Sequence, residues 1–131
     1  MAGPADTCQI DLRVRYAEVD QMGVLHHSRF WVYFEVGRTE LLRQRGMSYA
    51  ELERAGTFLV VAKCAAKFLA PARYDELLRL TTRAVHTGRA RIDHAYELRR
   101  KADDALLCTA ETTLACVDAH GRIIPLPDEL R

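Results

Sequence analysis

Residues 8–16 alternate strictly between apolar and polar side chains. A period of two predicts a β-strand with one buried face and one solvated face. The predicted inward residues are Cys8, Ile10, Leu12, Val14 and Tyr16.

Residues 30–44 follow a different period, with apolar side chains every three to four positions, which predicts an amphipathic helix. Gly37 falls on the apolar stripe of this helix. Because a glycine costs about 1 kcal/mol of helix propensity, its place there predicts the close approach of another backbone. We expect Ser28 to cap the start of the helix and Gly46 to end it in the left-handed conformation.

One short helix and four strands are predicted beyond residue 46. Ser48 and Glu51 form a capping box that opens the short helix, and Gly56 ends it. The predicted strands cover residues 57–70, 77–88, 90–100 and 105–118. Short turns between these strands force antiparallel neighbours. The pattern predicts an α+β fold, in which one five-stranded antiparallel sheet packs on one long helix and exposed sheet edges favour a homodimer.

Length and composition limit the class of protein. With 131 residues, a net charge of +1 and 49% apolar residues, the chain fits a single domain over residues 1–131. Its core is expected at about residues 8–118, followed by a short C-terminal tail. The balanced charge argues against a nucleic-acid partner. The start lacks the pattern of a signal peptide, and no apolar run approaches the roughly 18 residues of a membrane helix.

The four cysteines have no CxxC spacing. Without a secretory context they predict reduced thiols and a cytoplasmic location. Cys8, Cys108 and Cys116 occupy predicted inward positions, and Cys64 shares the parity of Val60 in its strand. All four are therefore interpreted as small core hydrophobes.

The stretch YAEVDQMGVLHHSRF contains the main candidate chemistry. Asp20 precedes Gly23 by three residues, which is a common turn signature. The helix that follows points its free N–H groups and the positive end of its dipole back into this loop, where they can bind an oxyanion. A carboxylate that faces such a donor can attack a carbonyl directly or through water. The residues alone leave the turn and the catalytic interpretation of Asp20 open.

His26 and His27 raise the alternative of a metal site. Adjacent histidines on an extended segment point to opposite sides, which leaves one histidine plus Asp20, too few ligands for a stable site. For His27, packing at the helix entry competes with a catalytic role. Glu35 is a third candidate, either as a general base or as a partner of Arg38. The sequence contains no G-x-S-x-G motif, so a nucleophilic triad is not expected. It contains no phosphate-binding loop or dinucleotide fingerprint, and no cofactor is expected.

Three motifs in combination resemble the hotdog-fold acyl-CoA thioesterases of the 4-hydroxybenzoyl-CoA thioesterase type, over about residues 8–118. The motifs are Y-x-x-x-D-x-x-G-V-x-x-H, Y-F-E-x-x-R and A-P-A-R-x-D. The resemblance implies a five-stranded antiparallel sheet wrapped around one long helix, with homodimers that share a continuous sheet and often pair into tetramers. It also implies hydrolysis of an acyl thioester to a carboxylic acid and free CoA, with acyl-carrier protein as another possible carrier.

The resemblance assigns site residues as well. The loop aspartate of the family falls on Asp20, which is implied to act as nucleophile or as general base towards water. The helix-start amide that binds the thioester oxygen falls on the backbone N–H of His27. Gly23 and Val24 are implied to shape the turn that lines the site.

Further residues follow from the same resemblance. The pantetheine arm is expected along the dimer interface near the partner's second strand, which maps to Val61, Ala62 and Lys63. Glu35 matches the glutamate of the Y-F-E motif, and a related hotdog branch uses a helix glutamate catalytically. Arg29 departs from the asparagine of many relatives. The alternative from another class is a dimer of the same fold that binds acyl-CoA or acyl-carrier protein without hydrolysing it.

Overall fold

The computed structural model describes residues 6–131, and residues 1–5 lie outside the described part of the chain. Five strands form one antiparallel sheet in the order β1-β3-β4-β5-β2. The strands are β1 (Thr7–Arg13), β2 (Phe58–Phe68), β3 (Leu77–Thr87), β4 (Arg91–Arg100) and β5 (Leu106–Val117). The α+β class and the five-stranded antiparallel sheet predicted from the sequence are confirmed.

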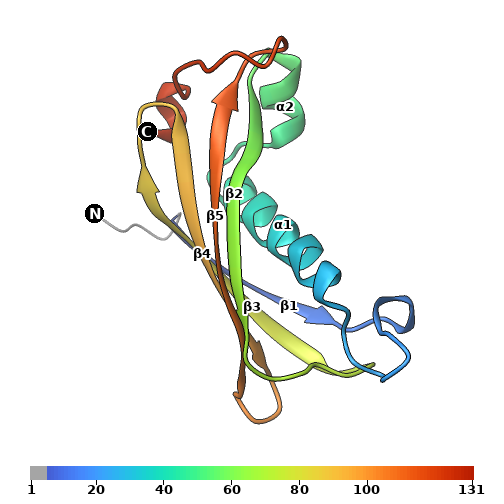
Figure 1. Cartoon of the computed structure of the whole chain (residues 1–131). Helices are drawn as coiled ribbons and strands as arrows, with labels where there is room; N and C mark the ends of the chain where they lie inside the picture. The colour runs from blue at the N-terminus through green and yellow to red at the C-terminus, as the bar shows by residue number, and fades with distance from the viewer. Residues whose placement is uncertain (1–5) are drawn as a thin grey trace.

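Two α-helices lie on the same side of this sheet (Figure 1). The long helix α1 (His27–Gln44) runs diagonally across the sheet, and the short helix α2 (Tyr49–Arg54) lies beside the first residues of β2. Single 3-10 turns follow β1 at Tyr16–Glu18 and lie near the C-terminus at Asp128–Leu130. Among the described residues, no helix is both long enough and apolar enough to span a bilayer.

The core lies between α1 and the inner face of the sheet. Phe34 of α1 is fully buried, and its ring stacks on Tyr96 of β4 with 4.6 Å between the ring centroids. A Cβ atom at Gly37 would overlap the Thr82 hydroxyl and lie 2.7 Å from Leu80 Cδ2. The predicted approach of another backbone is therefore wrong, because side chains of β3 fill the space at Gly37.

Local sequence signals set three of the helix ends. Gly46 and Gly56 have φ angles of 82° and 90°, so a left-handed glycine follows each helix as predicted. The side chain of Ser48 accepts a hydrogen bond from the Glu51 N–H at 3.2 Å. The predicted start of α2 is confirmed by this contact.

The first strand is shorter than predicted. Its pairing with β3 ends where Arg13 lies opposite Leu77, and the chain then turns through Tyr16–Glu18. The side chain of Tyr16 is 77% exposed, so its predicted inward position is wrong. The inward position predicted for Cys8 is confirmed, since that residue is buried.

Strand β2 lies at one edge of the sheet and contains a β-bulge. Val61 lies opposite Leu114 and Lys63 lies opposite Thr113, which leaves Ala62 without a partner in β5. One extra residue in a strand shifts the alternation of its side chains. The first and second halves of β2 therefore follow opposite parities.

The bulge corrects the prediction for the fourth cysteine. Val60 and Cys64 lie on opposite faces of the sheet, so their predicted shared parity is wrong. Cys64 lies opposite buried Thr112, on the face towards α1, yet it is exposed because β2 is an edge strand. The predicted burial is confirmed for Cys8, Cys108 and Cys116.

The segment after β5 packs against the domain. Leu126 and Leu130 are each 1% exposed and share a hydrophobic cluster with Leu52 of α2 and Ile92 of β4. This cluster closes the end of the core beneath α2.

Candidate functional site

Asp20 lies at the start of a tight turn that leads into α1. Val19 and Leu25 form an isolated antiparallel bridge, and the Asp20 N–H donates to the Val24 carbonyl at 2.9 Å. The Gly23 N–H donates back to the Asp20 carbonyl at 2.9 Å, with a φ angle of 79° at Gly23. A side chain at that φ angle would be strained, which explains the glycine.

The carboxylate of Asp20 divides its two oxygens between structure and solvent. Oδ1 accepts hydrogen bonds from the Met22 N–H at 2.9 Å and from the Val24 N–H at 3.3 Å. Among residues 6–131, no hydrogen bond involves Oδ2. The turn and the catalytic interpretation of Asp20 are therefore compatible, because one oxygen holds the turn and the other can meet a ligand.

The start of α1 differs from the predicted cap. His26, not Ser28, occupies the cap position, and its ring Nδ1 accepts the Ser28 N–H at 3.2 Å. The Arg29 N–H donates to the His26 carbonyl at 2.9 Å. The His27 N–H has no preceding turn to bind and makes no hydrogen bond within the described chain. This N–H is therefore available as a donor at the positive end of the helix dipole.

Glu18 connects the Asp20 segment to α1 and was not predicted as a site residue. Its side chain is 2% exposed, and Oε1 accepts hydrogen bonds from the Arg15 N–H at 2.8 Å and the Tyr33 hydroxyl at 2.7 Å. Its carbonyl accepts the His26 N–H at 3.0 Å. Glu18 and Tyr33 are fifteen residues apart on different elements, so no local sequence pattern indicates their contact.

The environment of Glu18 favours its charged form. Burial alone would raise the pKa of Glu18, but hydrogen bonds from the Arg15 N–H, the Tyr33 hydroxyl and the Arg15 guanidinium outweigh it and hold the pKa below its usual value. Burial, together with the hydrogen bond to Glu18, raises the pKa of Tyr33. The pair is therefore a carboxylate that accepts from a neutral phenol.

The two histidines do not diverge as expected. Their rings lie 4.2 Å apart between centroids and are tilted by 32°, because His26 takes the cap position and His27 opens the helix. Within the described residues, no group of three or more His, Cys, Asp or Glu side chains is placed to hold a metal ion.

A cavity of about 300 Å³ opens beside the start of α1. It is lined by Leu25, His27, Phe30, Phe68, Leu69, Ala70 and Pro71. The Leu25 N–H donates to the Ala72 carbonyl at 2.8 Å, and Val24 forms a bridge with Arg73. The A-P-A-R segment therefore holds the Asp20 turn against the far end of β2. Asp20 itself does not line this cavity.

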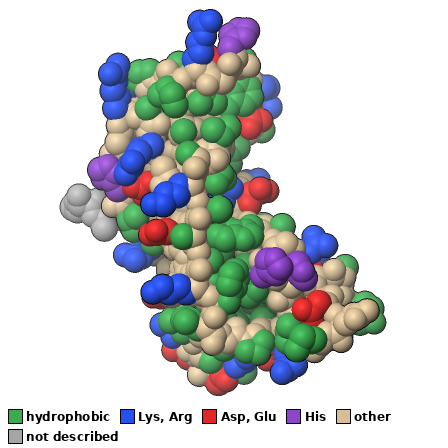
Figure 2. Space-filling view, in the orientation of Figure 1, with side chains coloured by type: hydrophobic (Ala, Val, Ile, Leu, Met, Phe, Trp, Pro, Cys, Tyr) green, Lys and Arg blue, Asp and Glu red, His purple; other side chains and the backbone are tan. Residues whose placement is uncertain are grey.

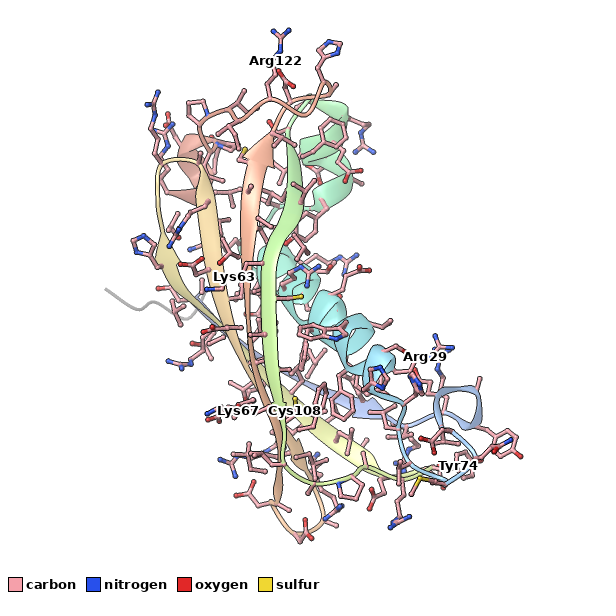
Figure 3. The ribbon with its side chains drawn as sticks, viewed as in Figure 1. Arg29, Lys63, Lys67, Tyr74, Cys108 and Arg122 are labelled. Atoms are coloured by element: carbon pink, nitrogen blue, oxygen red, sulfur yellow. The ribbon has the colours of Figure 1, made fainter. Side chains whose placement is uncertain are left out.

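The three predicted residues of β2 are separate from the Asp20 turn within one chain. Val61 lines a second cavity, of about 250 Å³, between α1 and β2. Ala62 is the bulge residue, and the side chain of Lys63 points away from α1 (Figure 3). None of the three lines the cavity at His27.

A five-stranded antiparallel sheet packed on one long helix is the architecture of the hotdog fold. The solved structure of DHNA-CoA thioesterase from Staphylococcus aureus has the same fold, with a TM-score of 0.88 and 28% sequence identity. The superposition covers 92% of this chain and 80% of that chain. The fold class predicted from the sequence is confirmed by this likeness.

The chain belongs to the thioesterase-like superfamily, whose family model matches residues 14–131. It is 31% identical to the acyl-CoA thioester hydrolase YbgC of Escherichia coli over 107 residues, which are 82% of this chain and 79% of YbgC. It is also 38% identical to YneP of Bacillus subtilis over 77 residues. These residues make up 59% of this chain and 52% of YneP, so the match covers about half of that relative. The resemblance and the enzyme class predicted from the sequence are confirmed: the protein is a thioester hydrolase.

Proposed function

We propose that this protein hydrolyses acyl-CoA thioesters, with Asp20 as the catalytic carboxylate and the His27 N–H as the donor to the thioester oxygen. Two free groups support these roles, namely Oδ2 of Asp20 and the N–H of His27. They lie on adjacent segments that Glu18 ties together. A positioned carboxylate and an oxyanion donor are the minimum requirement for acyl transfer to water.

In the proposed reaction Asp20 acts either on a water molecule or directly on the thioester carbonyl. As a general base, Asp20 takes a proton from water while the water oxygen bonds to the carbonyl carbon. As a nucleophile, its own oxygen forms that bond, the C–S bond breaks to leave a mixed anhydride between Asp20 and the acyl group, and water then cleaves the anhydride to the carboxylic acid and free Asp20. In either case negative charge develops on the carbonyl oxygen, where the His27 N–H stabilises it. In the general-base form the C–S bond breaks after water has added, and in both forms the departing thiolate takes up a proton to give free CoA.

The unpaired edge of β2 supports a homodimer as the active form. Val60, Val61, Phe68 and Leu69 of this strand and its end are each 44–55% exposed. Figure 2 shows hydrophobic side chains along the middle of this face, over β2 and α1. A long apolar edge strand is a site for pairing with another strand. We propose that β2 pairs with β2 of a second copy, which brings Val61, Ala62 and Lys63 to the partner's cavity as contacts for the pantetheine arm; dimers can pair further into tetramers.

The bulge adds support for this placement, because bulges are frequent at sheet edges and next to active sites.

The free cysteines, three of them buried, are consistent with a reducing compartment such as the cytoplasm.

The test compares Asp20→Asn with Asp20→Ala in a thiol-release assay over a panel of acyl-CoAs. Asparagine keeps an oxygen that can accept the Met22 and Val24 N–H bonds, so it removes the charge and spares the turn. We expect both variants to lose at least about a hundredfold in kcat, with only Asp20→Ala losing stability. Full activity of Asp20→Asn would exclude the assigned role.

His27→Ala is the companion variant, since it keeps the backbone donor. Its kcat should fall far less than that of Asp20→Asn. A comparable loss would assign the role to the ring instead. Single turnover in ¹⁸O-labelled water tests the nucleophilic form, because label enters Asp20 only when water cleaves an anhydride at the Asp20 carboxyl carbon. Acyl-CoA binding without thiol release would instead indicate a non-hydrolytic binding module.

A further inference from the structure

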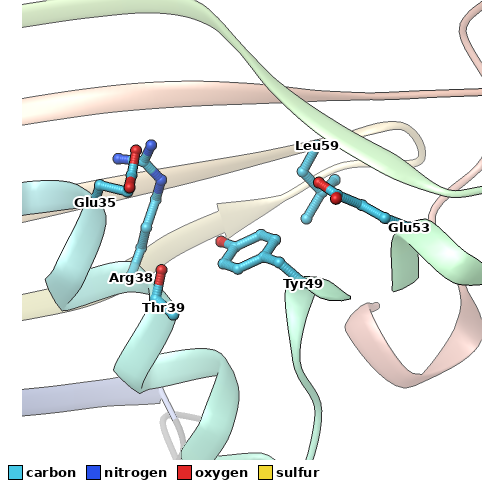
Figure 4. Close-up of a pocket in the computed structure, with 6 residues that line it drawn as sticks. All are labelled: Glu35, Arg38, Thr39, Tyr49, Glu53 and Leu59. Carbon is cyan, nitrogen blue, oxygen red and sulfur yellow. The ribbon is translucent and has the colours of Figure 1, made fainter. Parts of the chain in front are cut away.

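Three cavities follow one another along the side of α1 that faces β2. The first is the cavity at His27, and the second lies between Trp31 and Val32 of α1 and Val61 and Cys64 of β2. The third has a volume of about 300 Å³. It is lined by Glu35, Arg38, Thr39, Tyr49, Glu53 and Leu59 (Figure 4), and we name it the Arg38 chamber. Glu35 and Arg38 line both the second cavity and the chamber, so these two are contiguous.

The distance from the helix start to the chamber matches a medium-length chain. Glu35 follows His27 by eight residues, which is about 12 Å along the helix axis. An extended acyl chain of roughly ten carbons spans this length, because each C–C bond advances about 1.25 Å. The intervening cavity presents Trp31, Val32 and Val61, which suit methylene groups.

Polar groups replace apolar ones in the Arg38 chamber. The hydroxyl of Tyr49 points from α2 towards α1 (Figure 4). Burial raises the pKa of Tyr49 to about 12, although the adjacent Arg38 guanidinium acts in the opposite direction. Among the described residues, Arg38 forms no ion pair within 4.0 Å. The Arg38 guanidinium donates to the Tyr49 oxygen, so the Tyr49 O–H and the remaining N–H groups of Arg38 are the donors available to a ligand.

A buried histidine lies beneath the chamber. A narrow extension of about 20 Å³, lined also by Arg38 and Tyr49, reaches His94 of β4. His94 is 5% exposed, and its Nδ1 is buried without a hydrogen-bond partner. Buried polar atoms in folded proteins are nearly always paired, so this nitrogen indicates a small polar group that belongs there. The extension has room for about one water molecule or one hydroxyl group.

The charges of the lining select the kind of group. Glu35 and Glu53 oppose the single positive charge of Arg38 in the chamber. Arg45, which lines the extension, pairs with Asp6 at 3.0 Å, so a carboxylate would meet a net negative surface. A methyl group would give no partner to the Tyr49 O–H or to His94 Nδ1. A hydroxyl group can donate to a carboxylate or to His94 Nδ1 and can accept from Arg38 or Tyr49.

We propose that the Arg38 chamber binds a terminal hydroxyl group of the acyl chain, so that the preferred substrates are medium-length ω-hydroxyacyl thioesters. This role of the chamber rests on the proposed acyl-CoA thioesterase function. The thioester carbonyl lies at His27, the methylene groups cross the second cavity, and the hydroxyl reaches Tyr49 and Arg38.

The test measures kcat/KM for decanoyl-CoA and for ω-hydroxydecanoyl-CoA by thiol release. We expect the hydroxylated substrate to be favoured about fivefold or more, the factor of one net hydrogen bond. Tyr49→Phe removes one hydroxyl group and should bring the ratio close to one. Tyr74→Phe removes a hydroxyl from an exposed tyrosine outside the chamber and should keep the wild-type ratio. Using the ratio within each protein cancels differences in the folded fraction.

Three results would overturn the proposal. The first is equal kcat/KM of the wild type for decanoyl-CoA and ω-hydroxydecanoyl-CoA, and the second is an unchanged ratio in Tyr49→Phe. The third is a preference of the wild type for an acyl chain of the same length that ends in a carboxylate. Calorimetry with the Asp20→Asn variant measures the Kd of decanoyl-CoA and of ω-hydroxydecanoyl-CoA, and the ratio of the two Kd values reports the same preference without turnover. If the wild type hydrolyses no acyl-CoA, the proposed function fails, and the binding ratio still decides the role of the chamber.

Discussion

The hydroxyl of Tyr33 donates a 2.7 Å hydrogen bond to Oε1 of Glu18, and the carbonyl of the same Glu18 accepts the His26 N–H at 3.0 Å. One residue therefore fixes α1 at two points relative to the strand-like segment that leads to Asp20. The spacing between the proposed catalytic carboxylate and the proposed oxyanion donor depends on this residue.

Tyr33→Phe should weaken this connection without creating a large cavity. Because the buried carboxylate loses one of its donors, we expect the free energy of unfolding to fall by about 1–3 kcal/mol. We also expect kcat to fall more than KM changes, since the misplaced groups act on the transition state. Urea denaturation and thiol-release kinetics measure the two effects. Tyr16→Phe, at a tyrosine 77% exposed, is the control and should change neither; wild-type kcat and stability in Tyr33→Phe would contradict the role.

Glu18→Gln should give a pH-dependent loss of stability. The folded pKa of Glu18 lies below its usual value, so the folded state binds fewer protons than the unfolded state as the pH falls past that value. The stabilisation is complete above the unfolded pKa of about 4.3 and is lost as the pH falls through the folded pKa. The difference in unfolding free energy between wild type and Glu18→Gln should therefore be largest near neutral pH and shrink in acid. A difference that stays constant down to acid pH would exclude an ionised Glu18.

His94 should make the wild type less stable in mild acid. Burial, together with the charges of Arg38 and Arg45, lowers the pKa of His94 to about 4, while Asp93 acts weakly in the other direction. Between the unfolded pKa of about 6.5 and this value, only the unfolded state binds the proton, so stability decreases as the pH falls. The decrease should approach about 3 kcal/mol, and His94→Gln should lack it. Parallel pH profiles of the two proteins would contradict this expectation.

Gly37→Ala should destabilise the protein although alanine favours helices. The gain in helix propensity is about 1 kcal/mol, whereas overpacking commonly costs about 1–3 kcal/mol. Here the added methyl group would overlap the Thr82 hydroxyl and approach Leu80 Cδ2 at 2.7 Å. We expect a net loss in thermal unfolding experiments, partly restored by Thr82→Ala in the same chain. A Gly37→Ala variant more stable than the wild type would show that the β3 side chains can move to make room for the methyl group.

Val60→Lys should disrupt the proposed dimer. Val60 is 44% exposed on the outer face of β2, so a lysine there adds charge at the edge without entering the cavities beside α1. Sedimentation should show a dimer for the wild type and a shift towards monomer for the variant. Ile123→Lys, at an apolar residue 66% exposed outside the strands, should stay dimeric. A dimeric Val60→Lys would assign the interface to another surface.

The elements that the sequence predicted correctly are those set by neighbours in the chain. Alternation predicts the buried face of β4, and Ser48, Gly46 and Gly56 end or begin helices through contacts within a few residues. The bulge at Ala62 depends on pairing with β5, about fifty residues later, and nothing in the local pattern indicates it. The face of the sheet on which Cys64 lies was predicted wrongly for that reason.

The candidate site shows the same division. Asp20 and Gly23 stand out because a turn signature precedes a helix, whereas the His27 N–H was indicated only by the family resemblance. His26 was missed as the cap because a ring nitrogen is an uncommon acceptor in that position, and Ser28 fits the usual preference better. Glu18 was missed because its partner Tyr33 reaches it only after α1 folds onto the sheet.

The unpartnered position of Ala62 has a consequence for changes in chain length. Deleting a residue from a regular strand moves every later side chain to the other face of the sheet. Deleting Ala62 would not, because Val61 and Lys63 already lie opposite consecutive residues of β5. A homologous chain one residue shorter at this position can therefore keep all of its inward and outward residues, so Ala62 marks where this edge strand tolerates a gap in an alignment.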